Sequence, residues 1–197
     1  MIILDVSDDN IEEAELLYPF HNLNNSITGG RSQLYGAIGE VMVKEYYDAS
    51  YVGDYDYDLS INNFRVEVKT KRTSVTPQPH YWCSVPALNT KQDCDYYYFT
   101  RVSLDYRRCY LLGYLPKEKF FAISVFMKKG DLDGDHFTIK EDCYSVPVGD
   151  LWLKKKIITI FVSCRLSQRS RGSGCGPMSL RWHSDGLMRR RGVGRQS

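Results

Sequence analysis

Alternating apolar and charged residues mark one short stretch of the chain as a candidate site. In the segment FRVEVKTKR at residues 64–72, Glu67 and Lys69 fall on the charged face of a strand. Positions that share a face are roughly 6.6 Å apart along a strand. A carboxylate and an ammonium group at this spacing, with a second carboxylate close to them, would suit the hydrolysis of phosphodiester bonds.

The second acid comes from the preceding segment if the two segments pair as a hairpin. Asn62–Asn63 fits the turn between 51–61 and 64–72, because Asn tolerates the positive φ of a two-residue loop. Pairing back from this turn places Asp58 opposite Glu67. Directly opposed Cβ atoms are about 4.5–5.5 Å apart, and two carboxylates at that distance repel each other unless a cation lies between them.

Such a pair of acids predicts a divalent-metal site. Carboxylate oxygens are the hard ligands that Mg²⁺ or Mn²⁺ prefers. A metal held by Asp58 and Glu67 would lower the pKa of a bound water and neutralise charge on a phosphate. Lys69 would stabilise the developing negative charge or orient the attacking water. Asp58, Glu67 and Lys69 are therefore the candidate catalytic residues, with Mg²⁺ or Mn²⁺ as the cofactor.

Two further charged residues are auxiliary candidates with ordinary alternatives. Asp56 shares the face of Asp58 and would meet Lys69, whereas Lys71 lies on the Glu67 face and could contact phosphate. A solvated lysine is an equally good interpretation of Lys71. The alternative for the whole segment is an exposed charged face of an edge hairpin, with a surface ion pair worth under about 1 kcal/mol.

The elements around the hairpin predict an α/β domain of the α+β kind, with a mixed central sheet flanked by helices. Gly39, in the middle of a helix expected over 31–47, indicates close packing of that helix on a neighbour. In chain order we expect a short helix over 11–18, the helix over 31–47, the hairpin over 51–61 and 64–72, an irregular segment over 73–94, strands over 95–103 and 108–115, a helix from 117 and a strand near 142–148.

Asp58 followed by Glu67-Val68-Lys69 on the next strand resembles the D…(D/E)xK signature of the PD-(D/E)XK nucleases, in particular small phage and restriction-type members. The resemblance covers about residues 30–150. It implies a restriction-endonuclease-like αβββαβ core, metal-dependent cleavage of DNA, and a homodimer where both strands are cut. A helix before the hairpin often supplies a further Glu in this family, so the resemblance assigns Glu40 as an additional metal ligand. Tyr57 stands where the family signature has Pro, a departure common in the family.

Composition divides the chain into an N-terminal extension over 1–27, a nuclease-like domain over 28–162 and a tail over 163–197. Residues 165–197 hold eight Arg, no Lys and one acid, whereas the other 164 residues carry 18 basic and 23 acidic side chains. The tail fits a disordered segment, a non-native end or a nucleic-acid-binding arm. The acidic body counts against a broad phosphate-binding surface. The net negative charge of the body leaves a second function as an alternative, a catalytically degenerate nuclease-fold module that binds nucleic acid or a protein.

Cysteine and hydropathy patterns predict a cytoplasmic protein with no membrane partner. The six cysteines form no CxxC pair, and the first five residues include an acid and no base, unlike a signal peptide. The apolar run IITIFV at 157–162 is far too short to span a membrane. We therefore expect reduced thiols.

Overall fold

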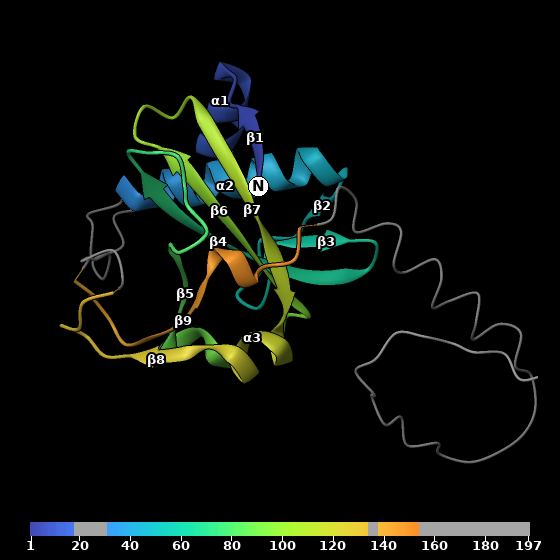
Figure 1. Cartoon of the computed structure of the whole chain (residues 1–197). Helices are drawn as coiled ribbons and strands as arrows, with labels where there is room; N and C mark the ends of the chain where they lie inside the picture. Colours follow the sequence, from blue (N-terminus) through green and yellow to red (C-terminus); the bar gives the residue numbers. More distant parts are fainter. Residues whose placement is uncertain (18–30, 134–137, 154–197) are drawn as a thin grey trace, which may run out of the picture. The chain divides into compact units, whose positions relative to one another are not determined.

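A mixed β-sheet of six strands organises the fold (Figure 1). The computed structural model describes residues 1–17, 31–133 and 138–153. The strands of this sheet are β1 (Ile2–Asp5), β2 (Ser50–Tyr51), β3 (Leu59–Ile61), β4 (Phe64–Thr73), β6 (Tyr96–Ser103) and β7 (Arg108–Pro116). Their order is β1-β7-β6-β4-β3-β2, and β4 pairs with β6 in parallel whereas the other neighbours are antiparallel. The predicted α+β class with a mixed central sheet is confirmed.

The hairpin of β3 and β4 turns at Asn62–Asn63, as predicted. Both residues have positive φ, 53° and 68°, a conformation that Asn tolerates better than most residues. Leu59 pairs with Val66, and Ile61 pairs with Phe64. This is the register that the sequence predicts, and it fixes which side chains of β4 share a face.

The first strand of the hairpin is shorter than expected. The predicted strand over 51–61 is wrong in part, because residues 52–58 form a loop between β2 and β3. The loop closes on itself, with the N–H of Val52 donating to the carbonyl of Asp58 at 2.8 Å. Gly53 within it has a φ of 63°, which glycine adopts without strain.

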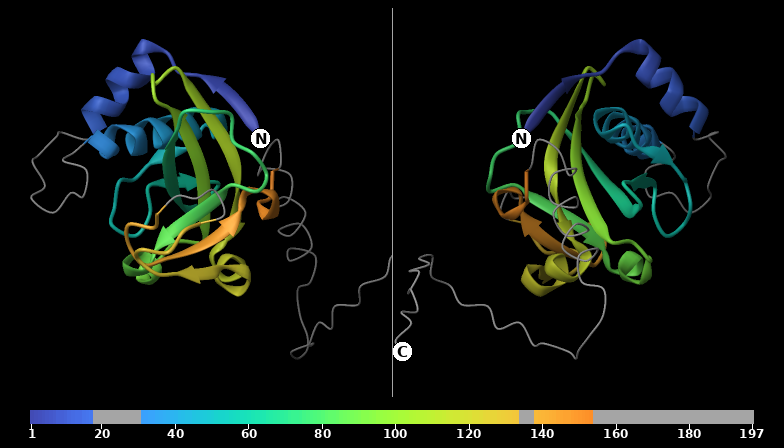
Figure 2. Two further views of the ribbon diagram at one scale, coloured as in Figure 1. Left: turned by 60° about the vertical axis from the view of Figure 1, so that its left-hand side comes forward. Right: turned by 90° about the vertical axis from the view of Figure 1, so that its right-hand side faces the viewer.

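Helix α2 (Arg31–Tyr47) packs on β4 and β6, and α1 (Asp8–Leu17) packs along α2 (Figure 2). The expected helix over 31–47 is therefore confirmed. A Cβ at Gly39 would lie 2.0 Å from Thr70 Oγ1 and 2.7 Å from Thr100 Oγ1. Only glycine allows so close an approach, so the close packing expected from Gly39 is confirmed as well.

A second sheet covers the opposite face of β4 and β6. It contains β5 (Trp82–Pro86), β9 (Cys143–Pro147) and β8 (Val125–Met127) in the order β5-β9-β8. Helix α3 (Lys117–Ile123) and the 3₁₀ turns η1 (Ala87–Lys91) and η2 (Val148–Asp150) complete this layer. Tyr97 and Phe99 of β6 pack here with Val85, Phe120 and Val146 in one hydrophobic cluster.

One expectation is wrong because distant segments pair, and a second segment takes part in a pairing that the sequence did not indicate. Residues 73–94, expected to be irregular, contain β5, whose five residues pair with β9. The segment 1–27, expected to be an extension, contributes β1, which pairs with β7 at the edge of the main sheet. Local sequence carries no sign of either partner, since both pairings join residues far apart in the chain.

Some expectations lie outside the described residues. These include the tail over 163–197 and both ends of the expected nuclease-like domain, at 28–30 and 154–162. The described part of the chain belongs to one unit, Met1–Thr159. No helix in this part is long and apolar enough to cross a membrane.

Candidate functional site

The charged face of β4 points toward the second sheet, away from α2. In the parallel pairing, Glu67 lies beside Tyr97 and Lys69 lies beside Phe99, and both aromatic residues belong to the cluster that includes β5 and β9. Glu67 is only 5% exposed, and the Lys69 side chain is 17% exposed. The alternative of an exposed face with a surface ion pair is therefore wrong for Glu67.

Asp58 reaches this face from the end of the loop before β3. Its backbone N–H donates to the carbonyl of Val66 at 3.1 Å. Its carboxylate Oδ2 accepts a hydrogen bond from the N–H of Val68 at 2.7 Å. This bond satisfies a β4 donor that lies beyond the end of the short strand β3, and it fixes the carboxylate against the centre of β4.

Asp58 and Glu67 hold their carboxyl groups against each other. Burial, followed by the negative charge of Glu67, raises the pKa of Asp58 to about 7. The Val68 N–H and the positive charge of Lys69 oppose this rise without offsetting it, and a direct interaction of the two carboxyl side chains adds to it. The structure therefore brings the two predicted acids together.

Glu67 is held by two donors through one of its oxygens. Lys69 Nζ donates to Oε1 at 2.5 Å, and Gln92 Nε2 donates to the same atom at 2.9 Å. Within the described residues, no hydrogen-bond donor reaches the buried Oε2. A buried carboxylate oxygen without a donor, next to a second carboxyl group, costs free energy unless a proton or a cation compensates it.

Gln92 is a site residue that the sequence did not indicate. It follows η1 and is 4% exposed, and its Nε2 also donates to the carbonyl of Tyr55 at 2.8 Å. Gln92 thereby links the loop before β3 to Glu67. It lies 25 residues from Glu67, outside any motif or alternation, so no local signal could have found it.

The donor set fits a cation that keeps most of its water. Mg²⁺ is usually bound through one or two carboxylates together with waters and substrate phosphates. Asp58 and Glu67 supply two carboxyl groups, and the Oε2 of Glu67 is an acceptor without a donor. In the described ranges, no group of three or more His, Cys, Asp or Glu side chains could hold a metal. Asp58 and Glu67 could therefore supply two carboxyl ligands to a cation, and its other ligands would be water or substrate.

Among the described residues, neither Glu40 nor Asp56 joins Asp58 and Glu67 in a group of three side chains that could hold a metal. Glu40 is 6% exposed on α2, and the adjacent Gly39 packs on Thr70, which projects from the face of β4 opposite to Glu67. Asp56 lies in the loop before β3, where its Oδ1 accepts a hydrogen bond from the N–H of Asp93 at 3.1 Å. The expected pairing of Asp56 with Lys69 is wrong, since regular pairing ends at Leu59.

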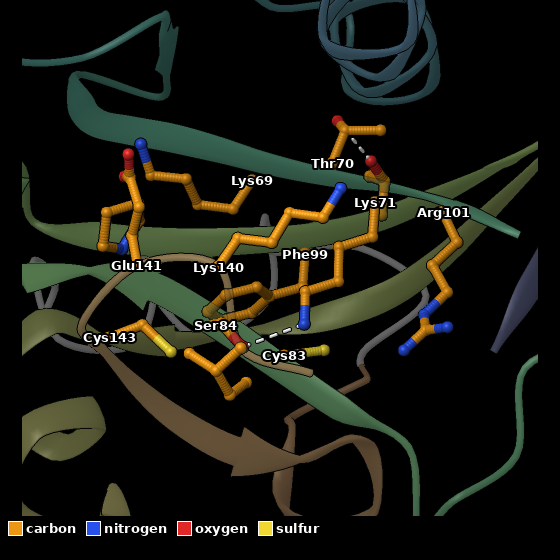
Figure 3. A pocket seen from close by; sticks show the side chains of 13 residues that line it. Lys69, Thr70, Lys71, Cys83, Ser84, Phe99, Arg101, Lys140, Glu141 and Cys143 are labelled. Carbon is orange, nitrogen blue, oxygen red and sulfur yellow. Dashed lines mark hydrogen bonds between the residues drawn. The ribbon is translucent and has the colours of Figure 1, made fainter. Parts of the chain in front are cut away.

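Lys71, the other auxiliary candidate, points into a cavity between the two sheets (Figure 3). Its Nζ donates to Ser84 Oγ at 2.9 Å and to the carbonyl of Trp82 at 3.1 Å. The cavity has a volume of about 270 Å³. Its charged lining residues are Lys69, Lys71, Arg101, Lys140 and Glu141.

Two comparisons with known proteins find no match for this chain. No protein-family model matches it, and no curated protein matches it significantly. The interpretation of the site therefore depends on the chemistry and geometry of its own residues.

Proposed function

We propose that the chain is a divalent-metal-dependent endonuclease that hydrolyses phosphodiester bonds in DNA, with Mg²⁺ or Mn²⁺ as its cofactor. The main support is the buried pair of Asp58 and Glu67, because burial and the negative charge of Glu67 raise the pKa of Asp58 to about 7. Lys69 lies on the same face and contacts Glu67. A restriction-endonuclease-like core, a homodimer and a cytoplasmic location belong to the same proposal, through the resemblance to PD-(D/E)XK nucleases and the sequence patterns.

Each residue of the site has a distinct role in this proposal. Asp58 and the Oε2 of Glu67 would hold the metal, which when bound supplies an acidified water and positive charge at the phosphate. Lys69 places its ammonium group where it can stabilise negative charge on that phosphate. Gln92 positions Glu67 by donating to Oε1, so that Oε2 stays directed away from this bond.

The test is cleavage of supercoiled plasmid and linear duplex DNA by the full chain. Wild-type protein should cut with Mg²⁺ and stop cutting with EDTA, and both Asp58→Asn and Lys69→Met should abolish cleavage. Lys119→Met is the matched control, because Lys119 is an exposed lysine of α3. Cleavage that survives EDTA and both site substitutions would overturn the proposal.

A catalytically degenerate module that binds nucleic acid or a protein is the second candidate. The observation that favours it is the lack of a third ligand beside Asp58 and Glu67 in the described part of the chain. Titration of Mn²⁺ in a calorimeter separates the two functions. A catalytic site binds Mn²⁺ and loses this binding in Glu67→Gln, whereas a degenerate module gives the same small heats with both proteins.

A further inference from the structure

Two cations lie side by side in the cavity between the sheets. Lys71 of β4 and Arg101 of β6 are direct neighbours in the parallel pairing, so their side chains share a face. Both donate to the carbonyl of Trp82, Lys71 at 3.1 Å and Arg101 at 3.2 Å. Like charges directly opposed on a sheet repel each other. A negative charge beside the pair would relieve this repulsion.

The hydrogen-bond partners of the pair leave its charge uncompensated. Lys71 bonds to a hydroxyl and a carbonyl, both neutral, and one of its three N–H donors has no partner among these bonds. The Arg101 guanidinium stacks on the Tyr81 ring, 4.9 Å from its centroid, and its buried Nε has no hydrogen-bond partner in the described residues. Lys71 thus has an N–H donor beyond its two bonds, and the Arg101 Nε is buried without a compensating acceptor among the described residues.

The nearby acids offset this charge only in part. Burial lowers the pKa of Lys71, and the charge of Arg101 adds to this effect. Asp133 acts in the opposite direction but does not cancel it, and Glu141 lies at the cavity wall beside Lys140. Burial favours the neutral amine of Lys71, and an anion beside the pair would act in the opposite direction and stabilise its charged form.

The cavity adjoins the proposed catalytic site through β4. Glu67, Lys69 and Lys71 occupy successive positions on one face of the strand, each roughly 6.6 Å from the next. Lys69 contacts Glu67 and also lines the cavity. An anion held by Lys71 and Arg101 would therefore lie a short distance along the strand from the carboxyl pair.

The size and lining of the cavity narrow the choice of anion. Its volume of about 270 Å³ is below the roughly 300–1,000 Å³ of pockets that take drug-sized ligands. A cavity of this size suits a phosphate with one attached sugar better than a nucleic-acid strand that runs through it. The apolar lining, which includes Phe99, Ile139 and Pro86, suits the carbon atoms of that sugar. Two cations are matched best by a phosphomonoester, which carries about −1.5 to −2 charges at pH 7.

We infer that this cavity binds a phosphomonoester, the terminal phosphate of a nucleic-acid strand, through Lys71 and Arg101. The inference rests on the proposed function, because it takes the ligand of the cavity to be a nucleic acid, and it adds a contact to a phosphorylated end without requiring that end for cleavage of an internal bond. It adds to that function a preference for the chemistry of the strand terminus.

The test measures binding without cleavage, by fluorescence anisotropy in EDTA with the full chain. Duplexes of one sequence carry a 5′-phosphate, a 3′-phosphate or hydroxyl groups at both ends, and a circular duplex has no ends. One terminal phosphate should tighten binding about tenfold, as expected for one good charge-assisted contact. Lys71→Met should remove this preference, whereas the exposed-lysine control Lys119→Met should keep it.

A second measurement distinguishes the loss of a binding contact in Lys71→Met from the loss of folding. Inorganic phosphate should raise the thermal midpoint of the wild-type protein more than chloride at equal ionic strength, and should not do so for Lys71→Met or Arg101→Met. Equal affinity for phosphorylated and hydroxyl ends, together with no specific effect of phosphate, would overturn the inference. Because no step requires cleavage, an inactive protein that still prefers a phosphorylated end would overturn only the nuclease proposal.

Discussion

Two clusters on the same strand contain the same kinds of groups and differ in nearly every property. At one end of β4, Arg65 bonds to Asp93 and to Asp95. In the middle of the strand, Lys69 bonds to Glu67, which lies against Asp58. Each cluster therefore holds two carboxyl groups and one cation.

The difference lies in burial and in hydrogen bonding. The Arg65 cluster is open to solvent, with the Asp93 side chain 69% exposed, and although burial acts to raise the pKa of Asp95, its hydrogen bonds to Arg65 lower it overall. In the buried cluster the pKa of Asp58 rises instead. Charge composition alone therefore does not identify a site. A buried acid pair with an oxygen that lacks a donor gives a physical reason to propose one.

The largest expected effect is on cleavage. Glu67→Gln should reduce the rate of Mg²⁺-dependent DNA cleavage by at least about 100-fold, as is typical when a charge-stabilising group is lost from an active site. The equivalent change in the exposed cluster, Asp95→Asn, should leave the rate within about twofold, since exposed ion pairs contribute little. Similar losses in both variants would show that the two clusters do not differ in function.

The next effect is on stability as a function of pH. The pKa of Asp58 is about 7 in the folded protein, against an ordinary value of 3.8 for an aspartate side chain, so the folded state binds this proton more tightly than the unfolded chain. The free energy of unfolding should therefore fall as pH rises from about 4 to 7. Asp58→Asn, whose amide oxygen can still accept from Val68, should remove this fall and be more stable than wild type at pH 8 by roughly 2–4 kcal/mol.

Asp95→Asn is the opposite control for this measurement. Its lowered pKa gives stability that is present above about pH 4 and is lost on acidification. The substitution should therefore destabilise the protein at pH 8, by less than about 1 kcal/mol because the ion pair is partly exposed. Urea titrations at pH 5 and pH 8 measure both variants. At pH 8, the change in the free energy of unfolding should have opposite signs in the two variants. A destabilised Asp58→Asn protein would refute the comparison.

A divalent cation should replace the proton between Asp58 and Glu67. At pH 8, Mn²⁺ at about 100 times its Kd should stabilise the wild-type protein by about 2.7 kcal/mol and raise its thermal midpoint by several degrees. The Glu67→Gln protein should show no such shift. Mg²⁺ or Mn²⁺ that stabilises both proteins equally would place the cation elsewhere.

The smallest effect is expected at Arg65. Arg65→Met should lower the thermal midpoint only slightly, and the difference from wild type should shrink in 1 M NaCl, because salt screens exposed ion pairs. Thermal melts at low and high salt measure this. A large loss that salt does not reduce would mean that the exposed cluster is structural after all.

The sequence predicted the part of the site that local patterns control. Alternation along 64–72 separates the faces of β4, and Asn62–Asn63 fixes the turn, so the register and the meeting of Asp58 with Glu67 followed from neighbouring residues. The same pattern made the predicted first strand too long. Alternation could not show that the Asp58 carboxylate accepts a hydrogen bond from β4 where strand pairing would otherwise continue.

The remaining parts depend on long-range packing. Gln92 reaches Glu67 from a 3₁₀ turn in a segment expected to be irregular. The cavity at Lys71 exists because β5 pairs with β9, some 60 positions later in the chain, and places Trp82 and Ser84 over β4. No spacing in the sequence encodes these contacts, since each depends on how the second sheet covers the first.

Anomalous diffraction from crystals soaked in Mn²⁺ at pH 8 tests the central claim most directly. We predict a Mn²⁺ peak between Asp58 and the Oε2 of Glu67, at coordination distances of about 2.1 Å from a carboxylate oxygen of each. Glu67→Gln crystals should lack this peak. Wild-type crystals with no Mn²⁺ between the two residues, and with their carboxyl groups turned apart, would contradict the account.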